Sequence, residues 1–356
     1  MPSSSPARLT LIIPELLWPE PADEIAWRGL ADSHAGWLIA RGRATEAPAR
    51  AFELALAACF GLDDPALARF RRLGEADLPT LAADERWLCA DPVHLRFHHE
   101  RIVLADAGAF EIERREADAL AADLNREFAD IGEFVVTDPR RWYLRLKATV
   151  DHRSAPISTV AGRRVASDLP ADTAGLTRWL NEVQMFLHLH PVNEGRQRAG
   201  QPAINSLWLW GAGQEQTPSP HFDRVWSGQE LATGLARAVG IPCAPLPDPT
   251  EIVRHTRAGE RQLLVLDSLL PPVLYENSED WHQAWQTLDR TWFAMLRSHL
   301  GADLPTVDLV APTIFGELRW QLAGRDRWKF WAGRQDIAGL ARSLAGAPQG
   351  ERAAGA

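Results

Sequence analysis

Residues that could hold an anionic ligand gather in the middle of the chain, in the stretch His190-Pro191-Val192-Asn193-Glu194-Gly195-Arg196. Asn193 and Arg196 are three residues apart, which places them on one face if this stretch is helical. A guanidinium group can bind a phosphate or a carboxylate through two parallel hydrogen bonds. We therefore expect ligand contacts from Asn193 and Arg196, with His190 also in reach of an anion. The alternative is that Asn193 caps a turn and Arg196 is a solvated charge.

A second group of candidate residues surrounds the apolar run Ile204–Trp210, which two glycines close. Glycines just beyond a strand let the backbone approach a ligand closely, although they also serve simply to turn the chain. A Rossmann dinucleotide site is excluded because Gln216 stands where its third glycine would be. The candidate ligand-binding residues of this group are Asn205, Trp210, Gly211 and Gly213.

The order and spacing of these two groups resemble the signature of the archaeal-type cofactor-independent phosphoglycerate mutases, members of the alkaline phosphatase superfamily. That family carries a His-Pro-x-Asn-x-x-Arg motif, a short spacer, and an Asn before an aromatic strand that ends Trp-Gly-x-Gly. His152 and Arg153 fall where the family has a His-Arg element, so the resemblance adds them to the ligand-binding set. The resemblance covers most of residues 85–240. A closer resemblance is to the family's proteobacterial relatives, which are known as regulators of pathogenicity factors, type E.

The elements that would position these residues alternate between helices and strands. The run Leu9–Ile13 is typical of a buried strand, and the periodicity of 114–128 and 176–190 predicts amphipathic helices. We expect 204–210 to be a central strand of the core and 317–331 to form a hairpin across Gly324-Arg325-Asp326.

This layout, and the resemblance, imply an α/β fold: an alkaline-phosphatase-like core sheet flanked by helices, with an inserted smaller α+β domain. We expect the core to comprise residues 9–85 and 200–344, and the inserted domain to comprise 86–199. The polar start of the chain, 1–8, and its Gly- and Ala-rich end, 345–356, are expected to be disordered tails.

The resemblance also implies a site for two divalent metals held by Asp and His, and here the chain departs from the pattern. The superfamily's first ligand follows the first strand directly, where this chain has Ile13-Pro14-Glu15. Ser33 and Thr45 are the nearest candidates for the family's nucleophile. We therefore expect no cofactor; the alternative is a pair of Mn or Zn ions on migrated ligands, namely Glu15, Asp267, Asp280, His282 and Asp289.

The composition excludes several classes of protein. With 38 basic and 47 acidic residues, the net charge of −9 argues against a surface for nucleic acid. The three cysteines are widely spaced and indicate neither a disulfide framework nor a thiolate zinc site. No apolar run is long enough for a signal peptide or a membrane span. We expect a cytoplasmic protein without a nucleic-acid or membrane partner.

The tryptophans bear on the function. Ten of the 15 lie from Trp179 onward, and we expect eight of these in the part of the core where metal ligands are expected: Trp208, Trp210, Trp281, Trp285, Trp292, Trp320, Trp328 and Trp331. Buried indoles would fill the space that a hydrated metal site needs, whereas exposed ones would suit a partner protein. We therefore expect a catalytically degenerate phosphoglycerate-mutase-like protein, a pseudoenzyme with a regulatory or phosphometabolite-binding role.

Its partners would be a phosphorylated small metabolite or a regulatory protein. Two alternatives stay open. One is an active, metal-dependent, 2,3-bisphosphoglycerate-independent phosphoglycerate mutase or phosphatase; the other is a protein-interaction module without a small ligand.

Overall fold

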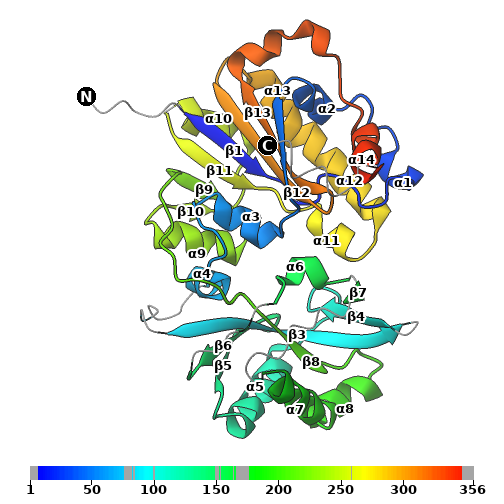
Figure 1. The fold of residues 1–356 in the computed structure, drawn as a ribbon, viewed down its shortest axis with the longest axis vertical. Helices are drawn as coiled ribbons and strands as arrows, with labels where there is room; N and C mark the ends of the chain where they lie inside the picture. Colours follow the sequence, from blue (N-terminus) through cyan, green and yellow to red (C-terminus); the bar gives the residue numbers. More distant parts are fainter. Residues whose placement is uncertain are drawn as a thin grey trace. The chain divides into compact units, whose positions relative to one another are not determined.

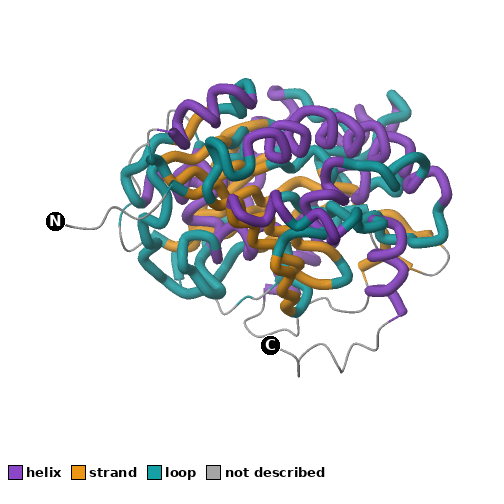
Figure 2. The backbone as a smooth tube through the Cα atoms, turned by 90° about the horizontal axis from the view of Figure 1, so that it is seen from above, coloured by secondary structure: helices purple, strands orange, loops and turns teal. Residues whose placement is uncertain are grey.

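The structure is a computed structural model that describes residues 7–75, 82, 85–98, 101–148, 152, 154–162, 164–165, 176–257 and 259–346. Its chain divides into two compact units: residues 1–61 with 218–356 form unit 1, and residues 62–217 form unit 2 (Figure 1). Figure 2 shows the helices and strands of the described residues by colour. Most of the two predicted tails lies outside the described residues, but Arg8 already belongs to a strand and 345–346 to a helix. No helix in the described part of the chain is long and apolar enough to cross a membrane.

Unit 1 contains a seven-stranded sheet in the order β10-β9-β11-β1-β12-β13-β2. The strands from β10 to β12 are parallel, and β13 and β2 are antiparallel to their neighbours. The predicted α/β fold class, a central sheet flanked by helices, is confirmed. The strands are β1 (Arg8–Ile12), β2 (Arg43–Ala47), β9 (Arg224–Trp226), β10 (Cys243–Ala244), β11 (Arg261–Val265), β12 (Thr306–Thr313) and β13 (Gly316–Ala323).

Helical segments of unit 1 connect these strands. They are α1 (Glu24–Trp27), α2 (His34–Ile39), α3 (Phe52–Ala58), α9 (Glu230–Ala238), α10 (Pro249–Arg257), α11 (Leu270–Leu274), α12 (Ser278–Leu288), the π-helical turn η1 (Asp289–Phe293), α13 (Ala294–His299), the 3₁₀ turns η2 (Gly324–Trp328) and η3 (Phe330–Ala332), and α14 (Ile337–Gly346).

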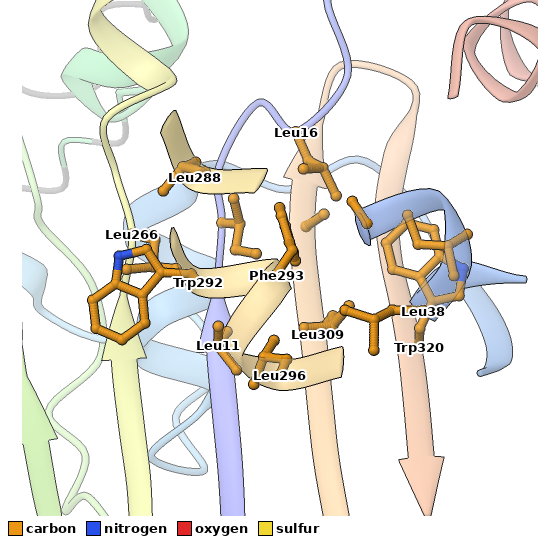
Figure 3. Packing of buried hydrophobic residues seen from close by; sticks show 14 of the residues in the cluster. Leu11, Leu16, Leu38, Leu266, Leu288, Trp292, Phe293, Leu296, Leu309 and Trp320 are labelled. Atoms are coloured by element: carbon orange, nitrogen blue, oxygen red, sulfur yellow. The ribbon is translucent and has the colours of Figure 1, made fainter. Parts of the chain in front are cut away.

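The alternation of side chains along the strands gives this sheet two different faces. Leu11 of β1 and Leu309 of β12 point to one face, where they pack against Phe293 and Leu296 of the helical segment that follows α12 (Figure 3). Trp320 of β13 extends the same core. Each Å² of apolar surface that this packing buries stabilises the fold by about 25 cal/mol. Because a shift of one residue would turn these side chains to the other face, the packing also fixes the register of the sheet. The polar residues that alternate with these apolar ones along the strands therefore point to the other face of the sheet.

The predicted second strand of the hairpin at 317–331 is wrong. Residues 317–323 are paired as expected of a strand, but they pair with β12 and β2, and the chain then enters η2 and η3. The Asp326 carboxylate accepts a hydrogen bond from the Ala323 amide at 2.7 Å, which turns the chain out of the sheet.

Unit 2 contains a six-stranded sheet, in which β5-β6-β3-β4-β7 are neighbours and β8 also pairs with β3. A second apolar core packs helices against it. Its elements are α4 (Leu67–Gly74), β3 (Arg86–His98), β4 (Arg101–Asp106), α5 (Arg114–Glu127), β5 (Gly132–Asp138), β6 (Arg141–Leu146), α6 (Ile157–Val160), β7 (Arg164–Val165), α7 (Leu176–His188), α8 (Pro191–Arg198) and β8 (Ser206–Trp210).

The strand predicted at 204–210 forms, but not in the core sheet of unit 1. It is β8, and it runs antiparallel to β3 with Leu209 opposite Ala90. Every residue of β8 is buried, as in a central strand. Its sequence therefore does not indicate which of the two sheets it joins. Unit 2 therefore extends beyond the limits expected for the inserted domain, 86–199, because α4 and β8 both lie within it.

Candidate functional site

Asn193 lies in α8, and its side chain is fully buried. Its Nδ2 donates to the Leu187 carbonyl at 2.7 Å and to the Ile204 carbonyl at 2.8 Å, and its Oδ1 accepts from the Ile204 amide at 2.7 Å. Both hydrogens of the amide group are used, so no donor remains for an anion. Asn193 joins the end of α7 to the chain that leads into β8.

Arg196 is 2% exposed and is surrounded by protein acceptors. Its Nη1 donates to the Glu116 carboxylate at 2.6 Å, its Nε to the Pro202 carbonyl at 2.7 Å and its Nη2 to the Glu111 carbonyl at 2.9 Å. Glu116 compensates the charge within the protein. The geometry therefore favours a structural role for Arg196. Because its side chain is buried, it is also not the solvated charge that we considered as the alternative.

His190 and Asn205 also contact the backbone of their own unit. His190 caps α8 through a hydrogen bond from the Val192 amide at 3.2 Å, and its Nε2 lies 3.0 Å from the Asp123 carboxylate. The Asn205 amide group pairs with the backbone of Leu95, accepting from its N–H at 2.7 Å and donating to its carbonyl at 2.8 Å. Both side chains support the entry into α8 and β8.

The remaining polar candidates of unit 2 show the same pattern. The His152 Nε2 lies 3.0 Å from the Leu209 carbonyl, and the Trp210 Nε1 donates to the Asp91 carboxylate at 2.8 Å. Arg153 lies outside the described residues. The side chains that the structure describes in the predicted ligand-binding set are therefore engaged with protein atoms.

Gly211 and Gly213 are required by a close approach of the backbone to the start of α4. Gly211 has a φ of +81°, and a Cβ atom there would lie 2.8 Å from the Ala68 nitrogen. A Cβ atom on Gly213 would lie 2.2 Å from the Pro65 carbonyl oxygen. The close approach that we expected toward a ligand is made toward protein.

The edge where parallel strands of unit 1 end would be the usual ligand site of an α/β sheet. Here Glu15 is buried with a φ of +55°. The Trp281 Nε1 donates to the Glu15 carbonyl at 2.9 Å, and the Trp285 Nε1 donates to the Leu16 carbonyl at 3.2 Å. Two buried indoles therefore pack beside the residue that would have to replace the family's first metal ligand.

The other residues of the alternative metal set serve different contacts. Asp267 accepts a hydrogen bond from Gln229, and Asp280 accepts one from Asn277 at 2.7 Å. The His282 Nδ1 lies 3.0 Å from a backbone carbonyl of α1. Among the described residues, no three His, Cys, Asp or Glu side chains come together as a metal site would require. Within the described part of the chain, the five residues of the alternative set therefore do not come together as one group.

Asp289 holds the N-terminus of α2. Its two carboxylate oxygens accept from the backbone amides of His34 at 3.0 Å and Ala35 at 2.8 Å. Ser33, one of the two candidate nucleophiles, caps the same helix by accepting from the Gly36 amide at 3.0 Å. Both side chains therefore stabilise a helix start, where a carboxylate is also favoured by the helix dipole.

Thr45, the other candidate nucleophile, lies on a polar face of the sheet that we did not predict from the sequence. One row of paired residues crosses four strands of the unit 1 sheet: Thr10 of β1 is opposite Asp308 of β12, which is opposite Gln321 of β13, which is opposite Arg43 of β2. Directly paired residues point to the same face of a sheet. This row therefore forms a polar band on the face away from the apolar core.

Further arginines extend this band. Arg8 is two residues before Thr10 and is paired with Arg261 of β11. In the same way, Arg319 is two residues before Gln321 and is paired with Thr45. A period of two keeps them on the same face. A cavity of about 890 Å³ lies over this face, walled by side chains of five strands, by 58–59 at the end of α3 and by 221–222. We call it the arginine pocket; its charged residues are Arg8, Arg43, Arg261, Arg319 and Asp308.

The charges of the arginine pocket suit an anion. Four arginines face one aspartate in its lining. Hydrogen bonds to Asp308 and Asp223 raise the pKa of Arg8 and Arg261, so both stay charged. Arg319 pairs with Glu317, but no carboxylate of the described residues pairs with Arg43. The pocket thus has an excess of positive charge on a protein whose net charge is −9.

Cys59 lies in the wall of the arginine pocket. Burial raises the pKa of its thiol to about 12, and this outweighs the opposite effect of Arg319. The thiolate is the nucleophilic form of cysteine, so a thiol that stays protonated is a poor nucleophile.

The sequence carries a signal for this pocket. Polar residues alternate with apolar ones in Arg8-Leu9-Thr10, in Thr306-Val307-Asp308 and in Arg319-Trp320-Gln321. Such alternation indicates a sheet with one polar face, whereas we predicted Leu9–Ile13 simply as a buried strand. The pairing that brings the three motifs together joins residues about 300 positions apart in the chain, as in Arg8 and Asp308, and is not visible in the sequence.

Comparisons with known proteins give a fold. No family model matches the chain, and no curated protein matches it. Among solved structures, PH0037 protein from Pyrococcus horikoshii is similar, with a TM-score of 0.55, 15% sequence identity, 95% of this chain covered and 97% of that one. The cofactor-independent phosphoglycerate mutase from Thermoplasma acidophilum aligns with a TM-score of 0.44 and 16% identity over 96% of this chain and 100% of that one. At 15% identity, the likeness to PH0037 protein shows that the two chains share a fold.

Proposed function

We propose that this chain is a non-catalytic binding protein for a small phosphorylated metabolite, with a regulatory role, and that the ligand occupies the arginine pocket. One observation carries the proposal: four arginines and a single aspartate line a cavity of about 890 Å³. The resemblance of residues 85–240 to cofactor-independent phosphoglycerate mutases, and to their relatives that regulate pathogenicity factors, supports the choice of ligand class. The described side chains that carry this resemblance bond to protein atoms in unit 2, which supports placing the ligand in the arginine pocket of unit 1.

The lining favours a ligand that combines acidic groups with hydroxyl groups. Arg43 can bind a phosphate or carboxylate oxygen pair, and Arg319, whose Nε and Nη2 already contact Glu317, can add a hydrogen bond from its Nη1. Asp308, Thr45 and Gln321, which lie in the same two rows of paired residues, can bind hydroxyl groups. A phosphorylated hydroxy acid such as a phosphoglycerate satisfies both requirements in one small molecule.

Three observations support binding without catalysis. The candidate metal ligands are dispersed, Ser33 serves as a helix cap, and the Cys59 thiol stays protonated. In the alkaline phosphatase superfamily, phosphoryl transfer would need a metal-activated oxygen nucleophile. The binding role that we propose requires no cofactor.

The test is calorimetric titration of the purified protein with 3-phosphoglycerate, 2-phosphoglycerate and inorganic phosphate. Replacing Arg43 and Arg319 together by Ala should weaken binding at least about tenfold, because each charged hydrogen bond contributes about 1.5–3 kcal/mol. Arg178→Ala is the matched control, since Arg178 is exposed on α7 in the other unit. The control should bind as the wild type does.

Other outcomes decide between the alternatives. No heat with any of the three ligands would refute the proposal and favour an interaction module. Loss of binding in Arg196→Ala, with the double variant unaffected, would return the site to the cluster that the sequence indicated. Interconversion of the two phosphoglycerates with added manganese, abolished by Asp267→Ala, would show an active mutase.

A further inference from the structure

Three large aromatic side chains are exposed together just after β13. Trp328 is 59% exposed, Phe330 74% and Trp331 82%. They lie on η2 and η3, in a segment of ten residues, 325–334, that we call the aromatic turn. Large apolar side chains that are exposed together, unlike single ones, mark an interaction site.

The backbone of the aromatic turn is held firmly at its base. The buried Arg41 donates from Nη1 to the Gly333 carbonyl at 2.7 Å, and its own carbonyl accepts from Lys329 Nζ at 2.8 Å. Asp326 pairs with Lys329 at 3.0 Å and closes the start of the turn on Ala323. A turn that is ordered in this way loses little conformational freedom when it binds. The exposure of its aromatic side chains is a feature of the fold.

The charge of the turn is opposite to that of the protein. The turn has a net charge of +3, whereas the whole chain has −9. The Arg327 guanidinium lies 5.1 Å from the centre of the Trp328 ring, so charge and aromatic surface are presented together. This charge suits an acidic partner. The four basic residues and the one acidic residue are Arg325, Arg327, Lys329, Arg334 and Asp326.

We propose that the aromatic turn binds reversibly to the surface of an anionic phospholipid bilayer. Trp side chains and basic residues are enriched at the level of the lipid headgroups, and each basic residue near an anionic surface contributes about 1 kcal/mol. Outside the turn, Asp32 pairs with Arg334 and neutralises one of its charges. At physiological salt, acidic residues more than about 8 Å away are largely screened, so a positive charge remains on the turn.

The exposed area favours a bilayer over a partner protein. The three aromatic side chains offer at most roughly 500 Å² in total, since a Trp or Phe side chain buries 150–250 Å². A stable protein interface needs about 800 Å² on each side together with complementary shape. A fluid bilayer surface accepts a small protruding turn without a matching groove. Our expectation of no membrane partner rested on the lack of an apolar run long enough to span a bilayer, and the surface binding proposed here departs from that expectation.

The test is co-sedimentation of the whole protein with two kinds of vesicle, one of phosphatidylcholine and one of phosphatidylcholine and phosphatidylglycerol in equal amounts. The wild type should bind the mixed vesicles, release them at high salt and leave the neutral vesicles unbound. Replacing Trp328, Phe330 and Trp331 together by Ala should abolish binding. Replacing Arg325 and Arg327 together by Glu should weaken it at least about tenfold.

A matched control removes equally exposed apolar side chains elsewhere. Met185 and Leu189 are 71% and 74% exposed, and their joint replacement by Ala should leave vesicle binding unchanged. Unchanged far-ultraviolet circular dichroism and melting would show that every variant is folded. The proposal is overturned if the wild type ignores mixed vesicles, if the triple variant still binds them, or if the turn instead drives self-association in sedimentation velocity without lipid. Phosphoglycerate binding enters none of these outcomes.

Discussion

At the scale of residues, buried polar side chains connect elements that lie apart in the sequence. Asn193 makes three hydrogen bonds that link α7, α8 and the residue before β8. Replacing Asn193 by Ala would remove the partner of the Ile204 amide and of the Ile204 carbonyl, whereas the Leu187 carbonyl would keep its hydrogen bond from the His190 amide at 3.2 Å. We expect Asn193→Ala to lower the free energy of unfolding by about 2–4 kcal/mol, measured by urea denaturation, because buried unpaired polar groups are costly.

The control for this prediction is Glu194→Ala, at an exposed position on the same helix, where a change within about 0.5 kcal/mol is expected. Phosphoglycerate binding should be the same in both variants and the wild type. A stable Asn193→Ala protein that has lost phosphoglycerate binding would contradict this interpretation and support a ligand contact.

The types and spacing of these residues are visible in the sequence, but their partners are not. Arg196 and Asn193 do lie on one helix, as their spacing indicated. Arg196, however, bonds to Glu116, 80 positions earlier, and this neutralises its charge. A motif fixes which side chains share a face, and only the tertiary fold decides whether that face meets a ligand or protein.

At the scale of elements, local patterns identify single helices and strands but not the sheet to which a strand belongs. The periodicity of 114–128 and 176–190 correctly indicates α5 and α7. The fully buried β8 could complete either sheet, and the prediction placed it in the wrong one. Pairing between distant strands follows from packing of the whole unit, and hydrophobic periodicity does not encode it.

The end of α4 gives an element-scale prediction about pH. Burial alone would raise the pKa of Glu75, but hydrogen bonds from Arg141 at 2.9 Å and Tyr143 at 2.7 Å outweigh it and lower the pKa. A carboxylate with a lowered pKa in the folded state stabilises the protein above its unfolded pKa of about 4.3, and this contribution is lost as the pH falls through the folded value. Glu75→Gln should therefore be less stable than the wild type at pH 7.

The difference between the two proteins should shrink as the pH falls below about 4.3, when free energies of unfolding are measured by urea denaturation at each pH. Glu194→Gln, at an exposed position of the same unit, serves as the control and should follow the wild type throughout. A difference between Glu75→Gln and the wild type that stays constant down to about pH 3 would show that the charge of Glu75 does not matter.

At the scale of the whole molecule, unit 2 is inserted into unit 1 through two neighbouring chain segments. In unit 2, the Gln214 amide donates to the Asp64 carbonyl at 2.9 Å, so the two ends of the unit lie together. In unit 1, the Ser219 amide donates to the Phe60 carbonyl at 2.8 Å, so the two points where the chain leaves and returns also lie together. Each unit has its own apolar core. We therefore expect each unit to fold by itself.

Two shortened chains test this independence and the location of the ligand site together. Residues 62–217 alone should unfold cooperatively, because a domain of about 150 residues can bury enough apolar surface to be stable. Residues 1–61 joined through two glycines to 218–356 should also fold, and this chain contains every residue of the arginine pocket. Titration with 3-phosphoglycerate should give the affinity of the full chain in the joined protein and no heat in 62–217. Binding to 62–217 instead would locate the site in the His190–Gly213 region, and the arginine pocket would then need another ligand.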